Sequence, residues 1–551
     1  MIQVDHLCLQ HGSQVLFRDA SFRLLPGSRT GLVGANGSGK TTIFRLLAGQ
    51  EQPDQGEIHK PKRTVIGYFS QDVGDMAGRS ALAEVVAAAE DVARLAGEMA
   101  ALEHAMAEPQ TDQAMAALLE RYGEASTEFE HRGGYDLEAR ARTMLGGLGI
   151  GPDRQERPVE TFSGGWKMRI ALARILTLVP DVLLLDEPTN HLDVESIVWL
   201  EEWLATEFKG ALLMTSHDRD FMNRVCDRTL EIAHRTITTY GGNYDFYVRE
   251  REVRRQQLLA SHRRQQEMLA KEEAFIARFA ARASHASQVQ SRIKQLEKIE
   301  RIEIPPELRV IRFEFPEPPR GGDDVARMQG LAKAWPLPEG GAQPVFSGVS
   351  GLIRRQEKIA VVGVNGAGKS TFLKVLAGLT PPTAGSLTLG AGVEIGYFSQ
   401  HALELLDPRK TVFETLQDAL PMTNRGTLCS LGGAFLFHGD EIDKPVLALS
   451  GGERSRVVLA CLLARPRNLL ILDEPTNHLD IQSRDVLLDA LRRFSGTVVL
   501  VSHDRMFLRA LVDRVYQIDH GSLRVFEGSY QYYLDKVHAE AQAVQPAVRV
   551  R

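Results

Sequence analysis

The sequence has few of the residues that cross-link secreted domains or hold metal clusters. Its 551 residues include four cysteines (Cys8, Cys226, Cys429 and Cys461), and no two of them form a CxxC pair. This spacing argues against a disulfide scaffold, a zinc site and an iron–sulfur cluster, and it suits a reducing compartment. No stretch approaches the ~18 apolar residues of a membrane-spanning helix, and the N-terminus has no basic-then-apolar leader. We therefore expect a cytoplasmic protein, neither secreted nor embedded in a membrane.

The sequence also lacks the positive charge of a protein that coats nucleic acid with its whole surface. It has 65 Lys and Arg against 71 Asp and Glu, which gives a formal net charge of −6. A local basic patch is still compatible with that total. Apolar residues make up 43% and charged residues 25%, an ordinary globular composition. At ~150 residues per domain, the length indicates three or four domains.

One set of short motifs occurs twice along the chain. A glycine-rich loop and the sequence IGYFSQ recur 329 residues later, whereas an SGG tripeptide and the sequence DEPTNHLD recur 287 residues later. Such self-similarity indicates two related domains. The difference of 42 residues places an insertion in the first copy, between Gln71 and Ser163. The stretch at about 84–128 is rich in Ala, Glu, Leu and Met, so we predict that the insertion is a helical arm.

The repeats predict four parts of the chain. These are a first α/β domain over 1–248, which contains the arm, a charged helical linker over 249–325, a second α/β domain over 326–534, and a short tail over 535–551. The helical part of the linker should stop before Pro305 and Pro306, which cannot continue a helix.

Each glycine-rich loop has the context of a phosphate-binding loop, because it follows an apolar run and precedes a helix start. Glycines allow backbone N–H groups to close around phosphates, and the lysine reaches the β- and γ-phosphates. The Thr41 and Ser370 hydroxyls can bind Mg²⁺. The predicted phosphate-binding residues are Gly34, Asn36, Gly37, Ser38, Gly39, Lys40, Thr41 and Thr42 in the first copy, and Gly363, Asn365, Gly366, Ala367, Gly368, Lys369, Ser370 and Thr371 in the second.

Buried strands deliver a pair of acids in each copy, in the sequences VLLLDE and LLILDE. Asp186 and Asp473 are predicted to hold Mg²⁺ through water. Glu187 and Glu474 are placed to polarise the attacking water or to accept its proton.

Three further pairs complete the predicted sites. Gln71 and Gln400 follow a strand and can join the shell of Mg²⁺ and water. A lone histidine is usually structural, but His217 and His503 recur at matched spacing, which favours contact with the γ-phosphate. The SGG tripeptides (Ser163, Gly164 and Gly165; Ser450, Gly451 and Gly452) each open a helix and offer a second anion seat. Each copy thus has two phosphate-binding segments, the glycine-rich loop and the SGG helix start. This implies that one of them contacts the nucleotide of the other copy.

Each copy has the glycine-rich loop, the glutamine, the SGG tripeptide, the acid pair and the histidine in the same order along the chain. This arrangement resembles that of the ATP-binding cassette superfamily. The tandem copies, the arm and the charged linker look like the ABC-F family, with a pattern similar to its YheS-like branch. The resemblance implies an α/β fold with two P-loop ATP-binding cassette domains in tandem, a helical arm in the first and a charged helical-hairpin linker between them. It implies a monomer whose paired cassettes form two composite sites that hydrolyse ATP to ADP and phosphate with Mg²⁺.

The resemblance also implies an aromatic side chain that stacks on adenine. Trp335 matches it in the second copy, and His11 takes its place in the first. The sequence departs from this family pattern at two further positions. The residue after each SGG tripeptide is Trp166 or Glu453, where transporters mostly have Gln. Gln356 stands at the position of Gly27.

ABC-F proteins are similar in being translation factors, so the resemblance implies binding at the ribosomal exit site and contact of the linker with peptidyl-tRNA. Residues 249–312 carry 15 Arg or Lys and 9 Asp or Glu, a net charge of +6. Arg282, Arg292 and Lys294 lie in an acid-free stretch that suits contact with a phosphate backbone of tRNA or rRNA. The alternative is a solvated spacer. The arm has 11 acids over 84–130 and only Arg94 and Arg121, so it suits a basic ribosomal protein.

Two rival functions remain open. The first is the ATPase subunit of a membrane ABC transporter that lacks its own membrane domain. The second is a DNA-repair or chromosome ATPase, but such proteins insert very long coiled coils or zinc modules, and the sequence has neither.

Overall fold

The structure is a computed structural model, and it describes residues 1–12, 14–35, 37–62, 64–70, 74, 76–107, 112–131, 134–279, 286–299, 301–302, 316–336, 341–399, 406–477, 479–519 and 521–544. Four predicted site residues lie outside these ranges, namely Asn36, Gln71, Gln400 and Arg282. The side chain of Arg292 is also outside the description.

The first half of the chain is built on a six-stranded sheet with the order β5-β6-β7-β3-β8-β9. All neighbours are parallel except β8 and β9. A smaller antiparallel sheet has the order β2-β1-β4. The strands are β1 (Ile2–His11), β2 (Gln14–Leu24), β3 (Arg29–Gly34), β4 (Gln55–His59), β5 (Ile66–Phe69), β6 (Val182–Asp186), β7 (Ala211–Thr215), β8 (Arg228–Ala233) and β9 (Thr236–Tyr240).

The second half repeats this topology strand for strand. Its large sheet has the order β14-β15-β16-β12-β17-β18, and its small sheet the order β11-β10-β13. The strands are β10 (Asp324–Pro336), β11 (Ala342–Arg354), β12 (Lys358–Val362), β13 (Ala384–Leu389), β14 (Ile395–Phe398), β15 (Leu469–Asp473), β16 (Thr497–Val501), β17 (Arg514–Asp519) and β18 (Ser522–Phe526).

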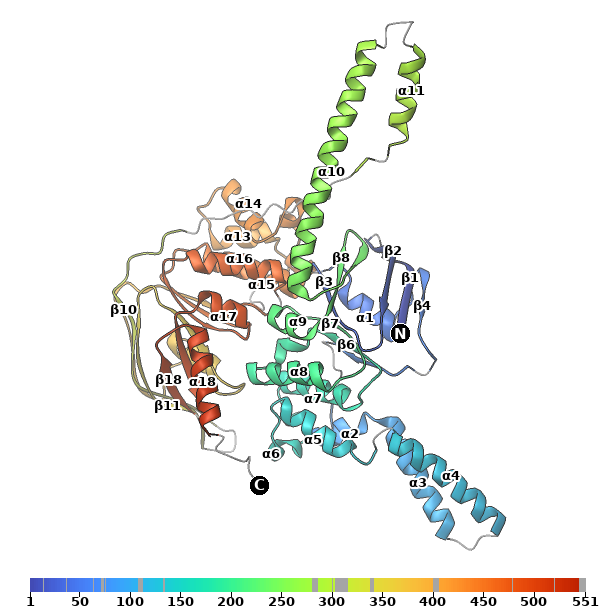
Figure 1. Cartoon of the computed structure of the whole chain (residues 1–551). Helices are drawn as coiled ribbons and strands as arrows, with labels where there is room; N and C mark the ends of the chain where they lie inside the picture. The colour runs from blue at the N-terminus through green and yellow to red at the C-terminus, as the bar shows by residue number, and fades with distance from the viewer. Residues whose placement is uncertain are drawn as a thin grey trace.

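Helices cover the sheets of both halves (Figure 1). Strands β6 and β7 are buried along their whole length, which explains why they are continuous apolar runs rather than alternating ones. The first-half helices are α1 (Lys40–Ala48), α2 (Ala81–Ala87), α5 (Leu137–Gly147), α6 (Pro152–Gln155), α7 (Gly164–Thr177), α8 (Val194–Thr206) and α9 (Arg219–Val225). The second-half helices are α12 (Lys369–Leu376), α13 (Val412–Ala419), α14 (Arg425–Ala434), α15 (Gly451–Leu463), α16 (Ile481–Arg493), α17 (Arg505–Leu511) and α18 (Tyr530–Val544).

The arm is a pair of helices, α3 (Glu90–Ala107) and α4 (Asp112–His131), that projects from the first half (Figure 1). Leu95, Met99 and Ala125 form a small buried core between the two helices. The arm therefore has a core of its own, and it joins the first half at its base (Figure 1).

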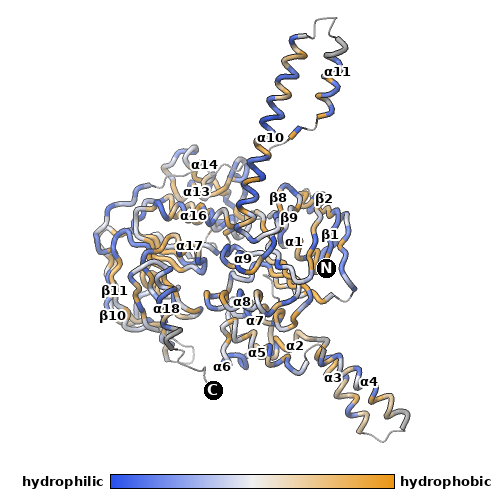
Figure 2. The backbone as a smooth tube through the Cα atoms, in the orientation of Figure 1, coloured by the Kyte–Doolittle hydropathy of each residue, from blue (hydrophilic) through white to orange (hydrophobic). Residues whose placement is uncertain are grey.

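The linker is a second projection, formed by α10 (Tyr244–Phe279) and α11 (Ala286–Glu297), and it extends away from the arm (Figure 1). Helix α10 begins five residues before the predicted boundary at 249 and is mostly hydrophilic (Figure 2). Its root is fixed by the buried Glu231, which accepts hydrogen bonds from the hydroxyls of Tyr240 and Tyr247, each at 2.9 Å. The predicted fold class, two tandem α/β domains with a helical arm in the first and a helical linker between them, is confirmed.

Candidate nucleotide sites in the two halves

The first phosphate-binding loop connects β3 to α1 and is shaped by glycine. Gly39 has φ +99°, a conformation that L side chains rarely adopt, and a Cβ there would lie 2.6 Å from the ring of Phe17. Lys40 Nζ donates to the carbonyl oxygens of Gly34 (2.8 Å) and Ala35 (3.2 Å). The Ser38 hydroxyl is buried and has no hydrogen-bond partner within the described residues. A ring of donors with an unsatisfied hydroxyl fits a phosphate group.

The second loop, between β12 and α12, repeats this geometry. Gly368 has φ +98°, and Lys369 Nζ donates to the carbonyl oxygens of Gly363 (2.8 Å) and Val364 (3.2 Å). Lys369 Nζ also lies 3.3 Å from Asn365 Oδ1, to which it donates. Both loops thus hold their lysine against the backbone of the loop itself.

Oxygen atoms that suit Mg²⁺ meet at the carboxyl ends of neighbouring strands. Thr41 Oγ1 donates to Asp186 Oδ2 at 2.7 Å, and Thr215 Oγ1 donates to Asp186 Oδ1 at 2.8 Å. In the second half Ser370 Oγ donates to Asp473 Oδ1 at 3.1 Å. Hydroxyl and carboxylate oxygens are the ligands that Mg²⁺ prefers, so both donor sets fit this ion.

The glutamate after each aspartate has an unusual backbone. Glu187 has φ +54° and Glu474 has φ +52°, values that are rare for residues other than glycine. Non-glycine residues in this region cost about 1–3 kcal/mol and cluster at functional sites. Burial raises the pKa of Glu187 to about 7 and that of Glu474 to about 7. Two copies of the same strained, buried carboxylate favour a chemical role over a structural one.

Each of these glutamates faces a histidine. The His217 amide N–H donates to Glu187 Oε2 at 3.1 Å, and His217 Nε2 lies 3.3 Å from Glu187 Oε1. His503 Nε2 lies 3.1 Å from Glu474 Oε1. Burial lowers the pKa of His503 to about 3, so this imidazole is neutral at physiological pH. A neutral ring next to the carboxylate can orient it without neutralising its charge.

The two SGG segments differ in how they begin their helices. Ser450 forms a capping box with Glu453: the Glu453 N–H donates to Ser450 Oγ at 3.3 Å and the Ser450 N–H donates to Glu453 Oε2 at 2.7 Å. Ser163 makes no side-chain cap. Beside it, the Trp166 ring makes cation–π contacts with two guanidinium groups, whose carbon atoms lie 4.0 Å (Arg154) and 4.5 Å (Arg169) from the ring centre. The two residues that replace Gln therefore have different contacts: Glu453 caps its helix together with Ser450, and Trp166 contacts two arginines.

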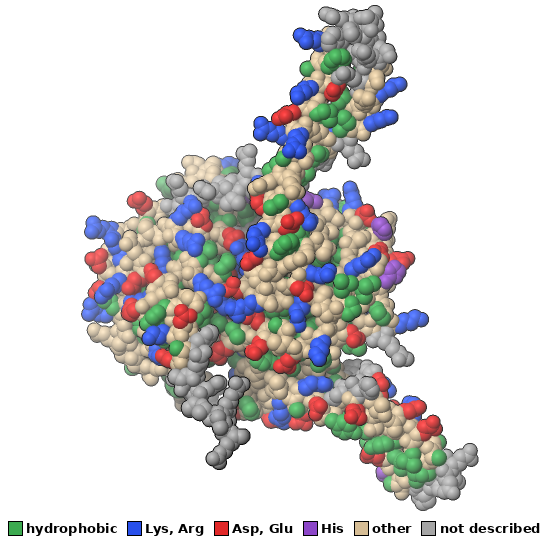
Figure 3. Space-filling view, in the orientation of Figure 1, with side chains coloured by type: hydrophobic (Ala, Val, Ile, Leu, Met, Phe, Trp, Pro, Cys, Tyr) green, Lys and Arg blue, Asp and Glu red, His purple; other side chains and the backbone are tan. Residues whose placement is uncertain are grey.

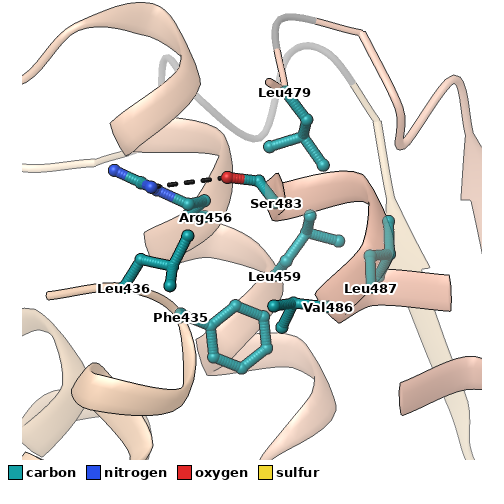
Figure 4. A pocket seen from close by; sticks show the side chains of 8 residues that line it. All are labelled: Phe435, Leu436, Arg456, Leu459, Leu479, Ser483, Val486 and Leu487. Atoms are coloured by element: carbon teal, nitrogen blue, oxygen red, sulfur yellow. Dashed lines mark hydrogen bonds between the residues drawn. The ribbon is translucent and has the colours of Figure 1, made fainter. Parts of the chain in front are cut away.

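The residue that matches Arg169 in the second half is Arg456, on α15. It donates to Ser483 Oγ of α16 at 3.4 Å, beside the apolar side chains of Leu459 and Leu487 (Figure 4). Arg169 makes the matching bond to Ser196 Oγ at 3.2 Å and also donates to Asp193 Oδ2 at 3.1 Å. The same arginine position thus fastens each SGG helix to the start of the following helix.

Charged groups of one half reach the phosphate loop of the other. Burial lowers the pKa of Lys40, and the nearby carboxylates of Glu187, Asp480 and Asp186 oppose that shift. Burial likewise lowers the pKa of Lys369, and the nearby carboxylates of Glu474 and Asp193 oppose that shift. Asp480 and Asp193 belong to the half opposite the lysine that they affect, so the two halves face each other across both loops.

Ion pairs join α8 and α9 of the first half to α16 and α17 of the second. Arg505 pairs with Glu201 and lies 3.3 Å from Asp218 Oδ2, and all three side chains are buried. Arg219 and Arg509 form more exposed pairs with Asp485 and Asp220.

The predicted adenine-stacking residues lie at the ends of long strands. His11 ends β1, and its Nε2 lies 2.6 Å from Glu51 Oε1. Trp335 is 41% exposed at the end of β10, with Lys333 Nζ 4.6 Å from the ring centre. Gln356 has φ +69°, the same backbone conformation as Gly27, so its side chain replaces glycine at some strain.

Two interactions were missed by the sequence analysis. Thr215 supports both acids, because its hydroxyl also accepts the Glu187 N–H at 3.0 Å. The Arg505–Glu201 pair joins residues 304 positions apart, for which the sequence carries no local signal. The Thr215 contact has one sequence signal, since Thr215 lies two residues before the duplicated His217. Its counterpart, however, is Val501.

Comparisons with known proteins agree with this fold. A family model described as ABC transporter matches residues 17–190 and 346–477, and a second model of that description matches 230–315. The chain is 36% identical to the putative ATP-binding protein YdiF of Bacillus subtilis, with 97% of this chain and 83% of that protein aligned. It is 34% identical to the probable ATP-binding protein YheS of Escherichia coli K12 (99% and 84%). It is 33% identical to ABC transporter F family member 5 of Arabidopsis thaliana (97% and 77%).

The solved structures show a similar fold at low identity. An archaeal ribosome recycling factor, in complex with a ribosomal stalk protein, has a TM-score of 0.59 and 18% identity, with 97% of this chain and 92% of that chain covered. A chain in a model of ribosome-bound archaeal Pelota and ABCE1 has the same score and identity, with 97% of this chain and 80% of that chain covered.

Proposed function

Because the chain belongs to the ABC-F family of ATP-binding cassette proteins, we propose that it is an ATPase that acts on the ribosome. Its paired cassettes hydrolyse ATP to ADP and phosphate at two composite sites. The protein works in the cytoplasm as a monomer, binds near the ribosomal exit site, and contacts peptidyl-tRNA and rRNA through its linker.

The observation that carries the ATPase proposal is the strained, buried glutamate that faces a histidine in each half. ATP supplies the γ-phosphate that is attacked, and Mg²⁺, when bound, would neutralise phosphate charge. Lys40 and Lys369 would hold the phosphates, while Thr41 with Asp186, and Ser370 with Asp473, would hold the ion.

Glu187 and Glu474 take the proton of the attacking water. Burial raises the proton affinity of both carboxylates, which suits a general base near neutral pH. The histidines orient these carboxylates. Gln71 and Gln400 would join the shell of the ion and its water, and Ser163 and Ser450 would contact the nucleotide of the opposite cassette.

The ribosome proposal is supported by the two helical projections. Lys and Arg side chains gather along the α10–α11 linker, and Asp and Glu side chains lie along the arm (Figure 3). Some exposed arginines on α10 pair with neighbours on the same helix, as Arg263 does with Glu267 at 3.3 Å. The linker can therefore exchange these weak pairs for phosphate groups of tRNA, whereas the arm suits a basic ribosomal protein.

The rival function, the ATPase subunit of a membrane transporter, is kept because the matching family models carry that description. Within the described residues, no helix is long and apolar enough to cross a bilayer. Sedimentation separates the two functions. With a non-hydrolysable ATP analogue, we expect the protein to sediment with ribosomes; sedimentation with membrane vesicles instead would support the transporter.

The linker is tested by changing Arg282, Arg292 and Lys294 together to Glu. Each phosphate contact contributes about 0.7–0.9 to the slope of log affinity against log salt concentration, so the slope should fall by about two to three. Changing Arg18, Lys60 and Lys62 to Glu alters the same charge on the first cassette and should leave the slope unchanged. A triple linker variant with the wild-type slope would mean that the linker is a solvated spacer.

A further inference from the structure

Arg484 joins two loops, which we call the histidine loops: residues 216–218 after β7, with His217, and residues 502–504 after β16, with His503. It lies on α16 of the second cassette and is 8% exposed. One guanidinium nitrogen, Nη1, donates to the carbonyl oxygen of His217 at 3.1 Å and to Asp504 Oδ2 at 2.9 Å. Asp504 directly follows His503. A single nitrogen atom is therefore bonded to the residue after one site histidine and to the backbone of the other.

The helix that carries Arg484 is firmly seated. Arg484 Nε donates to the Leu479 carbonyl oxygen at 3.0 Å, in the loop before α16. The neighbouring Leu487 packs against Leu459 and Phe435 in the second-cassette core (Figure 4). The helix is thus held in the second cassette, while its Arg484 side chain reaches the His217 backbone of the first cassette.

The first cassette has no equivalent of this arginine. The position 287 residues earlier is Ile197, which is 1% exposed in the first-cassette core. The Asp218 carboxylate, which matches Asp504, pairs with Arg505 of the second cassette. Both histidine loops are thus held by arginines of the second cassette. Arg505, two residues after His503, reaches Asp218 of the other loop, whereas Arg484 bonds the His217 backbone and Asp504 through one nitrogen.

We propose that Arg484 is a positioning residue that makes ATP hydrolysis at one site depend on the state of the other. The His217 amide N–H bonds Glu187, so a displacement of the His217 backbone changes the position of that carboxylate. At the second site the link runs through Asp504 to the neighbouring His503, which lies against Glu474. The inference rests on the proposed ATPase function and assigns to one side chain the connection between its two sites.

The test compares ATP turnover of the full chain with that of the single-site variants Glu187→Gln and Glu474→Gln. If the sites were independent, the two variant rates would add up to the wild-type rate, and the ratio of wild type to that sum would be one. Coupling between sites is typically 5-fold to 150-fold, so we expect the wild-type ratio to depart from one by about fivefold or more. Absence of any turnover would refute the proposed function, whereas turnover with a ratio of one would refute this inference alone.

Arg484→Met, introduced into all three proteins, should return the ratio to about one. If Arg484→Met does not fold, Arg484→Gln replaces it in the test. The glutamine side chain is polar but too short to reach both the His217 carbonyl oxygen and Asp504 Oδ2. Arg509→Met is the matched control, because it removes the pair with Asp220 between the cassettes without touching either histidine loop. An unchanged ratio in the Arg484 variants, or the same loss in Arg509→Met, would overturn the inference.

Discussion

Replacing Arg505 by methionine should destabilise the paired cassettes far more than the same change at Arg219, its counterpart in the first cassette. Arg505, Glu201 and Asp218 are 3%, 4% and 5% exposed, so the variant leaves two buried carboxylates without this cation. Removal of one partner from a buried ion pair costs about 3–5 kcal/mol. Glu201 keeps Arg224 at 3.3 Å, which points to the lower end of that range.

Arg219 makes the weaker contact. Its side chain is 25% exposed, and that of its partner Asp485 is 51% exposed. Such solvated pairs contribute about 1 kcal/mol or less. At roughly 2–4 °C per kcal/mol for a domain of this size, Arg505→Met should lower the transition by roughly 6–12 °C and Arg219→Met by less than about 4 °C.

Tryptophan fluorescence during heating measures this difference, because Trp199 and Trp203 lie on α8 together with Glu201. The chain has several domains, so the quantity to compare is the midpoint of the transition that α8 reports, not a global free energy of unfolding. Equal shifts for the two variants would refute the reasoning, since burial would then not decide the strength of the contact.

Three further changes test other parts of the structure. Glu187→Gln combined with Glu474→Gln preserves size but removes both carboxylates, so ATP should still bind while phosphate release falls about 10²–10⁴-fold; near wild-type release would rule out their role. Deleting residues 94–127 should weaken ribosome sedimentation but spare the ATPase of the free protein, because the arm has its own core; loss of solubility would contradict this. Ser450→Ala should lower stability by about 1 kcal/mol in a thermal melt, and Ser163→Ala by much less, because only Ser450 caps its helix; equal losses would contradict the capping difference.

The sequence predicted the fold class and many of the residues that meet at the sites, for a physical reason. In a parallel sheet the carboxyl ends of all strands lie at one edge, so motifs that follow β3, β6 and β7 must converge. The hydrogen bond from Thr41 to Asp186 and the contact of His217 with Glu187 are such meetings. Their roles in catalysis stay predictions.

The partners of individual side chains were harder to predict. In the sequence Trp166 is only a departure from Gln, and nothing there indicates that the guanidinium groups of Arg154 and Arg169 contact its ring. Likewise, the sequence shows Glu453 only as a departure from Gln, and its capping bond with Ser450 is seen in the structure alone. Side-chain contacts of this kind depend on how loops and helices are placed, which residue type and spacing do not determine.

The least predictable feature is that two sites with matching motifs are connected unequally. Each motif pair recurs at a fixed spacing, and from that repetition alone one expects equivalent sites. Arg484 and Ile197 break the equivalence at a position that belongs to no motif, in helices whose starts are otherwise matched by Asp480 and Asp193. Ile197 fills a core, and a core position tolerates many apolar side chains, whereas a guanidinium that is 8% exposed needs acceptors and finds them on both histidine loops. An inequality between duplicated sites is therefore best sought where one copy buries a charge and the other does not.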